Sequence, residues 1–187
     1  MVTYYFWGLK MQIKEVFLPG VLLIEPKIFS DDRGLFYESF NQARYQECGI
    51  KKAFVQDNIS RSHKNVIRGL HYQLIHPQAK LVSVISGQVF DVVVDIKPGS
   101  PTYGKWFGQI LSDENHLQLY IPEDYAHGFC VLSETADFMY KCTDYYHPQG
   151  ERGIRFDDPD INIDWPIEKN KAIVSPKDLV HPFLNAV

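Results

Sequence analysis

Six consecutive residues, Arg68-Gly69-Leu70-His71-Tyr72-Gln73, place a histidine close to a fixed positive charge, and a second cation follows at Lys80. Histidine has an unperturbed pKa of about 6.5, so His71 can accept a proton near neutral pH. The two cations can hold negative charge that develops beside it. These side chains suit enolate chemistry on an anionic substrate, in which a carbon next to a carbonyl group loses a proton.

Short β-strands must position these residues. From about residue 80 onward, strand-like runs recur at intervals of about 8–12 residues, which is typical of sandwiches and barrels. The runs are residues 80–86, 88–96, 105–111, 116–121, 128–132 and 136–143, with turn-forming residues between them. The one early helix that we expect covers residues 41–49, from its cap Asn41 to Gly49. Short helices near the C-terminus would pack on the outside of this all-β domain.

Strand alternation indicates which side chains share one interior, because successive residues of a strand point to opposite faces. His71 and Gln73 fall on one face of their strand, and Lys80 falls on the same face as the apolar Val82. Tyr140 lies on a face with Phe138. A barrel whose interior receives His71, Lys80 and Tyr140 together is therefore geometrically feasible.

Two carboxylates interrupt the Val-rich strand over residues 88–96. Alternation places Asp91 and Asp95 on the same face, and buried carboxylates need partners. We expect Asp91 to pair with a pocket residue and Asp95 to have a structural role.

Composition limits the classes of function. The 187 residues suffice for one domain with a substantial core, which we place at residues 11–187. Residues 1–10 would form a disordered extension, with Met11 as an alternative start. The formal net charge of −4 argues against a nucleic-acid coat or a binder of anionic membranes, since both need a basic surface. Phosphate binding must therefore come from a local cluster.

The cysteines and the hydropathy of the chain favour a protein that resides in the reducing cytoplasm. Cys48, Cys130 and Cys142 include no Cys-x-x-Cys pair, and their odd number leaves no complete disulfide framework. No apolar run reaches the about 18 residues of a membrane span, and the first residues lack the basic start and cleavage site of a signal peptide.

Several further motifs make the chain resemble one enzyme family. They are Asp32-Arg33-Gly34 with Phe36 and Glu38, Phe54-Val55-Gln56-Asp57-Asn58, residues 90–96, Ile121-Pro122-Glu123-Asp124-Tyr125-Ala126-His127-Gly128-Phe129, Tyr140-Lys141 and Ser175-Pro176-Lys177-Asp178. Together with residues 68–73 they resemble the dTDP-4-dehydrorhamnose 3,5-epimerase family, in the family's order, from about Met11 to the C-terminus.

The resemblance implies a cupin-type double-stranded β-helix, or jelly roll, that assembles as a homodimer and uses no metal and no cofactor. It also implies a substrate, dTDP-4-keto-6-deoxy-D-glucose, which is inverted at C3 and C5 to dTDP-4-dehydro-L-rhamnose in dTDP-L-rhamnose biosynthesis.

The residues themselves favour a metal-free pocket. A metal-binding cupin would be expected to carry a His-x-His pair and a nearby Glu, whereas this chain has His71-Tyr72-Gln73 followed by Lys80, whose ammonium would repel a divalent ion.

Four catalytic residues follow from the resemblance. His71 corresponds to the general base, and Asp178 corresponds to the carboxylate that orients it and stabilises the imidazolium. Lys80 corresponds to the lysine near the substrate carbonyl, where its charge offsets the enolate. Tyr140 corresponds to the proton donor on the opposite face, since a phenol with a pKa of about 10 remains protonated at pH 7.

The resemblance also implies a set of residues that hold the nucleotide sugar. They are Arg33, Glu38, Gln56, Asn58, Arg68, His127, Glu151 and Lys177. Arg33 and Glu38 would come from the neighbouring subunit, and the guanidinium groups of Arg33 and Arg68 suit diphosphate oxygens. The remaining histidines have no such context, and we expect them on the surface or in turns: His63, His76, His116, His147 and His181.

Two other functions stay open. An enzyme that inverts only C3 would use the same residues, and the outcome would depend on how the sugar is held against Tyr140. A sugar-binding cupin without turnover is the third reading. A binder needs no acid and base on opposite faces, so the presence of His71, Asp178, Lys80 and Tyr140 argues against it.

Overall fold

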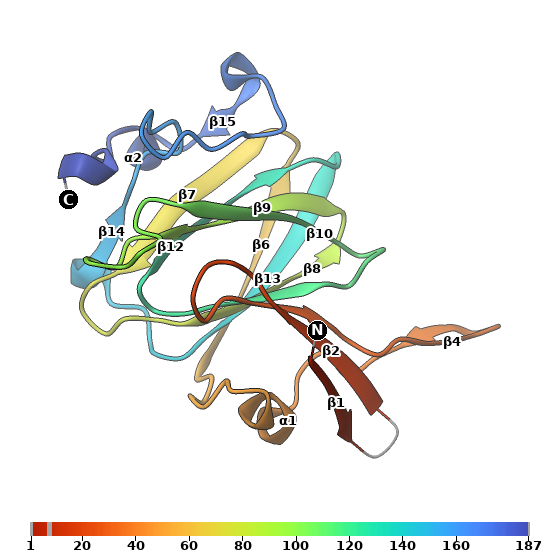
Figure 1. Cartoon of the computed structure of the whole chain (residues 1–187). Coiled ribbons are helices and arrows are strands. Elements are labelled where there is room, and N and C mark those ends of the chain that lie inside the picture. Colours follow the sequence, from red (N-terminus) through yellow and green to blue (C-terminus); the bar gives the residue numbers. More distant parts are fainter. Residues whose placement is uncertain (1, 7–8, 187) are drawn as a thin grey trace.

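The computed structural model describes residues 2–6 and 9–186 as two antiparallel β-sheets that pack face to face (Figure 1). The larger sheet has, within this part of the chain, seven strands in the order β1-β2-β3-β11-β8-β13-β6. Their bounds are β1 Val2–Phe6, β2 Leu9–Glu15, β3 Leu22–Glu25, β11 Gln118–Ile121, β8 Lys80–Ser86, β13 Thr135–Cys142 and β6 Gln56–His63.

The second sheet faces it and carries the motif with His71. Its antiparallel order is β10-β9-β12-β7-β14, and a short strand, β15, pairs with β7 in parallel. Their bounds are β10 Trp106–Ser112, β9 Gln88–Asp95, β12 Tyr125–Val131, β7 Val66–Gln73, β14 Glu151–Gly153 and β15 Ile173–Val174. The two sheets form a jelly roll, as the family resemblance implied.

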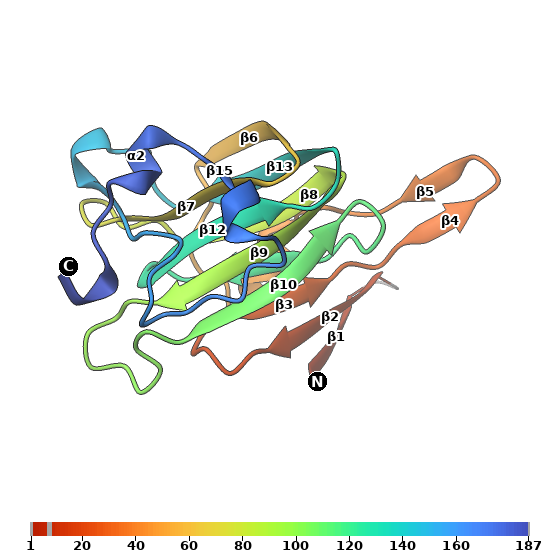
Figure 2. The same ribbon diagram turned by 90° about the horizontal axis from the view of Figure 1, so that it is seen from above.

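A hairpin and several short helices lie outside the sandwich. The hairpin projects well away from both sheets (Figure 2). It consists of β4 (Phe29–Asp31) and β5 (Gly34–Phe36). The helices are α1 Gln42–Glu47, α2 Pro176–Leu179, and the 3-10 turns η1 Pro148–Gly150, η2 Lys169–Lys171 and η3 Leu184–Ala186.

The apolar core lies between the two sheets. Strands β8, β11 and β13 contribute Val82, Leu119 and Phe138, and these pack against Val93 and Phe129 from β9 and β12. All five side chains are at most 5% exposed. Burial of this kind stabilises a fold by about 25 cal/mol for each Å² of apolar surface, so the core is what holds the sheets together.

Each sheet also has a covered outer face. On the larger sheet, Tyr45 of α1 packs against Ile24 and Leu81. On the second sheet, the segment after β14 lays Phe156 and Trp165, among others, against the outward side chains of β7 and β9. The C-terminal segment is therefore an integral layer of the domain.

Most sequence-based elements are confirmed. Strand β8 has the predicted bounds, and α1 begins after Asn41, whose side chain accepts a hydrogen bond from the backbone N–H of Arg44. Of the predicted N-terminal extension, residues 1, 7 and 8 lie outside the described residues, and among the others β1 pairs with β2 as an antiparallel hairpin at the edge of the larger sheet. Pairing of residues 2–6 with residues 9–13 gives backbone groups in this segment their partners. All three cysteines are free and buried, and no helix in the described ranges has the length and apolar character needed to cross a membrane.

A bulge in β7 sets the orientation of the motif around His71. His71 pairs with His127 of β12 and Arg68 pairs with Phe129, so β7 has one more residue than β12 between these pairs. In a regular strand, residues three apart point to opposite faces. The extra residue brings Arg68 and His71 to the same face, where both line one cavity.

Two glycines permit this bulge. Gly69 has a φ of +112°, and a Cβ there would lie 2.6 Å from the carbonyl oxygen of His127 and 2.7 Å from the Cα of Gly128. A Cβ on Gly128 would lie 2.6 Å from the carbonyl oxygen of Arg68. The backbones of β7 and β12 are therefore too close here for any side chain.

We expect Gly69→Ala to destabilise the protein more than Gly99→Ala. Gly99 also has a positive φ, +79°, but a Cβ there would meet nothing within 4 Å. The control should lose about 1 kcal/mol from the strained φ alone, whereas Gly69→Ala should lose more than about 2 kcal/mol because backbone atoms must move. Urea denaturation of both variants measures the difference. Equal losses would show that β7 and β12 can separate at no cost.

Candidate active site

One cavity of about 530 Å³ opens between the sheets and collects most of the predicted site residues. This volume lies within the range of pockets that enclose small organic ligands. The predicted residues that line it are Arg68, His71, Lys80, His127, Tyr140, Lys177 and Asp178. They come from β7, β8, β12, β13 and the C-terminal segment.

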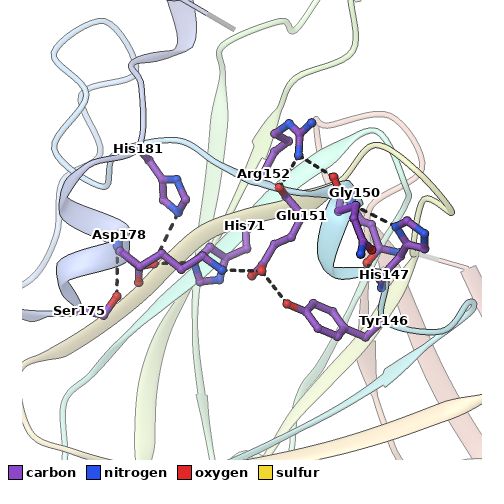
Figure 3. Close-up of polar contacts among 12 residues, drawn as sticks. His71, Tyr146, His147, Gly150, Glu151, Arg152, Ser175, Asp178 and His181 are labelled. Carbon is purple, nitrogen blue, oxygen red and sulfur yellow. Dashed lines mark hydrogen bonds and ion pairs between the residues drawn. The ribbon is translucent and has the colours of Figure 1, made fainter.

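His71 and Asp178 form a hydrogen-bonded pair although 107 residues separate them (Figure 3). The distance from His71 Nε2 to Asp178 Oδ1 is 2.8 Å. The carboxylate side chain is 5% exposed, whereas the imidazole is 31% exposed. One partner is thus fixed inside the protein and the other reaches the cavity.

Local structure holds Asp178 in place. Helix α2 lies against β7 and begins after Ser175, whose side chain accepts a hydrogen bond from the Asp178 backbone N–H. The backbone N–H of Gly69 donates to Asp178 Oδ2 at 3.3 Å. Burial alone would raise the pKa of Asp178, but the hydrogen bond and the charge of His71 hold that pKa below its ordinary value. The carboxylate therefore stays ionised beside the imidazole.

Lys80 and Tyr140 reach the same cavity from the larger sheet. Lys80 Nζ lies 3.4 Å from the carbonyl oxygen of His71, which places its charge next to the histidine. Burial lowers the pKa of Lys80, and the negative charge of Asp91 opposes this shift. Burial also raises the pKa of Tyr140, so the phenol keeps its proton at neutral pH.

A second histidine–carboxylate pair lies deeper in the protein. His127 Nε2 is 2.8 Å from Asp91 Oδ2, and the two side chains are 8% and 0% exposed. Burial lowers the pKa of His127, while Asp91 opposes the shift. Asp91 thus pairs with a pocket residue, as predicted. Asp95 binds the hydroxyls of Ser100 and Thr102 in the following turn, which is a structural role.

Glu151 and Lys177 form an ion pair at the rim. Glu151 lies close to His71 (Figure 3). The hydroxyl of Tyr146 also donates to Glu151, at 2.7 Å. Burial would raise the pKa of Glu151, but the hydrogen bonds from Lys177 and Tyr146 lower it. Glu151 lies at the start of β14, directly beside β7.

The structure separates the other predicted residues from the cavity lining. Gln56 and Asn58 lie next to it on β6, where Asn58 is the strand partner of Tyr140. Arg33 is at the tip of the projecting hairpin, 89% exposed, and its guanidinium binds Asp31. Glu38 binds Arg44 at 2.7 Å, away from the cavity.

His181 was predicted as a surface or turn residue, and this was wrong. Its side chain is 13% exposed, and its Nε2 lies 3.6 Å from Asp178 Oδ1. Its ring meets that of His71 edge to face, with 5.8 Å between the centroids. Burial, followed by the charge of His71, lowers its pKa. The spacing of three residues from Asp178 was the available signal, because residues three apart lie on one side of a helical turn.

Comparison with known proteins identifies the family. A family model described as dTDP-4-dehydrorhamnose 3,5-epimerase matches residues 15–186. The dTDP-4-dehydrorhamnose 3,5-epimerase of Pseudomonas aeruginosa is 51% identical over 169 residues, which cover 90% of this chain and 93% of that protein. The chain belongs to the dTDP-4-dehydrorhamnose 3,5-epimerase family.

Solved structures agree with this membership of the epimerase family. The dTDP-6-deoxy-D-glucose-3,5-epimerase of Legionella pneumophila, in complex with dTDP-4-keto-L-rhamnose, superposes with a TM-score of 0.92 and 55% identity, covering 95% of this chain and 94% of that one. A 3'-monoepimerase of Streptomyces bikiniensis, in complex with dTDP-quinovose, superposes with a TM-score of 0.85 and 32% identity, covering 91% of this chain and 86% of that one. The cupin-type jelly roll is thus shown, and it also occurs in an enzyme named for inversion at one position.

The buried pair of His127 and Asp91 gives a stability prediction. His127→Phe should lose about 3–5 kcal/mol of unfolding free energy, because it leaves a fully buried carboxylate without its partner. The double variant Asp91→Val/His127→Phe should regain most of this loss, since no uncompensated charge remains. Denaturant unfolding of both variants is the measurement. A double variant as unstable as the single one would mean that the pair does not account for the loss.

Proposed function

We propose that this protein inverts dTDP-4-dehydro-6-deoxy-D-glucose at C3 and C5 to give dTDP-4-dehydro-L-rhamnose. The observation that carries the proposal is the His71–Asp178 pair, which lines one cavity together with Lys80 and Tyr140. A base, a cation and a phenol in one pocket are the groups that epimerisation through an enolate needs.

The substrate chemistry fits these groups. C3 and C5 both flank the C4 ketone, so each carries a hydrogen that can leave as a proton if negative charge on the ketone oxygen is stabilised. His71 takes that proton, and the electrons of the C–H bond form the enolate. Lys80, held beside His71, offsets the charge on the oxygen. Tyr140 then gives a proton to the same carbon from the opposite face. No atom is gained or lost overall, and solvent returns the protons of His71 and Tyr140 to their starting places.

The tautomer of His71 follows from its hydrogen bond. Because Nε2 faces the ionised Asp178, Nε2 carries the hydrogen and Nδ1 is left as the base. Nδ1 forms no hydrogen bond with any residue in the described ranges, which leaves it available to substrate. When the ring becomes an imidazolium, Asp178 stabilises its charge.

Substrate holding is proposed for the cations and polar groups around the cavity. Arg68 and Lys177 line it and can bind diphosphate oxygens, while His127, Glu151, Gln56 and Asn58 contact its wall or rim. This local cluster of positive charge compensates for the acidic character of the whole chain. The groups proposed here are all side chains, and no metal or cofactor has a step in the reaction.

Inversion at C3 alone is the second candidate. The Streptomyces bikiniensis 3'-monoepimerase has the same fold at 32% identity, so the fold alone does not decide how many carbons are inverted. The two 3,5-epimerases, at 51% and 55% identity, are more similar to this chain than the monoepimerase is. This supports inversion at both C3 and C5.

Deuterium exchange tests the proposal. Incubation with dTDP-4-keto-6-deoxy-D-glucose in deuterated water should replace the C3 and C5 hydrogens, which proton NMR detects as loss of both signals. His71→Asn should abolish both exchanges, and the exposed His63→Asn should not. Tyr140→Phe should slow inversion more than exchange, whereas Tyr120→Phe, which lies over the outer face of the larger sheet, should change neither.

The possible results are distinct. Exchange at C3 alone would favour the monoepimerase. A lack of exchange at both carbons would exclude both enzymatic functions. Normal turnover by His71→Asn would show that another group is the base.

We also propose that the protein is a homodimer in which Arg33 and Glu38 complete the partner's site. The β4–β5 hairpin extends away from its own sheets (Figure 2). Its side chains Phe29, Leu35 and Phe36 are exposed. Large apolar side chains gathered on a projecting hairpin need a covering surface. A hairpin that docks on a second subunit would bring Arg33 to that subunit's cavity.

Mixed dimers test this arrangement. Arg33→Ala and His71→Asn homodimers should each have little activity. After subunit exchange, a site formed by His71 of one chain and Arg33 of the other contains both native residues, so activity should return. Turnover assays before and after exchange measure it. If activity does not return although mass spectrometry shows mixed dimers, Arg33 serves its own subunit.

A further inference from the structure

Two side chains of the cavity lining and one beside it offer a set of metal-ligating atoms. His71, Asp178 and His181 each present one nitrogen or oxygen, and these atoms lie within 4.8 Å of one another (Figure 3). They come from β7, from α2 and from the segment that follows α2. The proposed epimerisation assigns roles to His71 and Asp178 and none to His181.

His181 is directed into this cluster without a partner of its own. Its Nε2 is buried and, among the described residues, has no hydrogen-bond partner. A buried polar atom of this kind costs free energy unless something binds it. The ring also occupies space that a glycine leaves open, since a Cβ on Gly153 would lie 2.4 Å from His181 Nε2. Gly153 is the strand partner of His71, which keeps the two imidazoles next to each other.

We propose that His71, Asp178 and His181 form a binding site for a zinc-type divalent cation, and that this ion inhibits the enzyme. Two ligands about 2.0–2.1 Å from a tetrahedral zinc lie about 3.3–3.4 Å apart. The distances from Asp178 Oδ1 to the two histidine nitrogens are 2.8 Å for His71 and 3.6 Å for His181, on either side of this value. Small side-chain movements are enough to place both nitrogens and the oxygen around one ion.

The charges at the three ligand atoms permit a cation. The Lys80 ammonium, which disfavours a divalent ion in the open cavity, contacts the backbone carbonyl oxygen of His71 at 3.4 Å and not its imidazole Nε2. Asp178 supplies a negative charge, and the nearby ammonium of Lys177 is neutralised by its ion pair with Glu151. Two imidazoles and one carboxylate match the ligand preference of zinc, with a fourth position left for water.

Inhibition follows from the tautomer of His71, and this step rests on the proposed role of His71 as the base. A metal bonded to Nε2 requires that nitrogen without its hydrogen, so the hydrogen moves to Nδ1. Nδ1 then has no lone pair to accept a proton from the substrate. The ion binds Nε2, whereas the substrate meets Nδ1 on the other side of the ring. Turnover therefore falls while substrate binding changes little.

Cobalt(II) binding tests the site without using activity. Tetrahedral cobalt(II) with nitrogen and oxygen ligands has visible absorption bands that aqueous cobalt(II) lacks, and zinc should displace it. We expect wild-type protein to bind one cobalt(II) per chain, and His181→Gln to bind it about 10- to 100-fold more weakly or not at all. His181→Ala is the second variant, in case glutamine alters the fold.

His76→Ala is the matched control, because His76 forms a similar but exposed cluster with Asp144 and His147. It should bind cobalt(II) like the wild type. An absence of tetrahedral bands in the wild type, or their loss in His76→Ala with retention in both His181 variants, would overturn the proposal.

Kinetics then separate the metal site from the proposed function. Zinc should lower kcat with little change in KM, a chelator should restore it, and His181→Gln should resist zinc. If cobalt(II) binds as expected but zinc leaves turnover unchanged, the inhibitory role is refuted. If metal binds and the wild type never turns over substrate, the proposed epimerase function fails while the metal site stands.

Discussion

The close approach of β7 and β12 at Gly69 and Gly128 is the constraint on which the active site depends. It accommodates the extra residue in β7 and turns both Arg68 and His71 toward the cavity. The same segment places the Gly69 backbone N–H against Asp178, so one local irregularity orients the proposed base, His71, and anchors the carboxylate that binds it. Without the bulge, the guanidinium and the imidazole would point to opposite faces of the sheet.

The side chains proposed for the chemistry are divided between two layers of the molecule. Lys80 and Tyr140 belong to strands of the larger sheet, whose side chains also build the central core. Asp178 belongs to the C-terminal segment, which covers the outer face of the second sheet through residues such as Phe156 and Trp165. Side chains near the end of the chain therefore act on a histidine in its first half because apolar packing on one face of a sheet holds that segment in place.

Local sequence patterns predicted what depends on local structure. Turn residues and strand length set the bounds of β8, Asn41 capped α1, and alternation placed Asp91 on the inner face where it meets His127. The position of His181 depends on how the C-terminal segment packs and on the space above Gly153, which is a contact between distant parts of the chain. The sequence offered no signal for the pairing of residues 2–6 with residues 9–13, because register is weakly specified in an edge strand. The family resemblance supplied the roles of Asp178 and Tyr140, which spacing alone could not assign.

The location of Asp178 gives the enzyme two levels of stability. The sandwich is held by a core shared between both sheets, whereas the short helix α2 is four residues long and lies at the surface of β7. Proteins open locally at a lower free energy than they unfold globally, and such openings involve segments with few buried contacts. Detachment of α2 would disconnect the imidazole from its carboxylate while the β-sheets stay intact. Such an opening would leave a folded molecule that lacks the proposed catalytic pair, and circular dichroism of the backbone would not distinguish it from the native one.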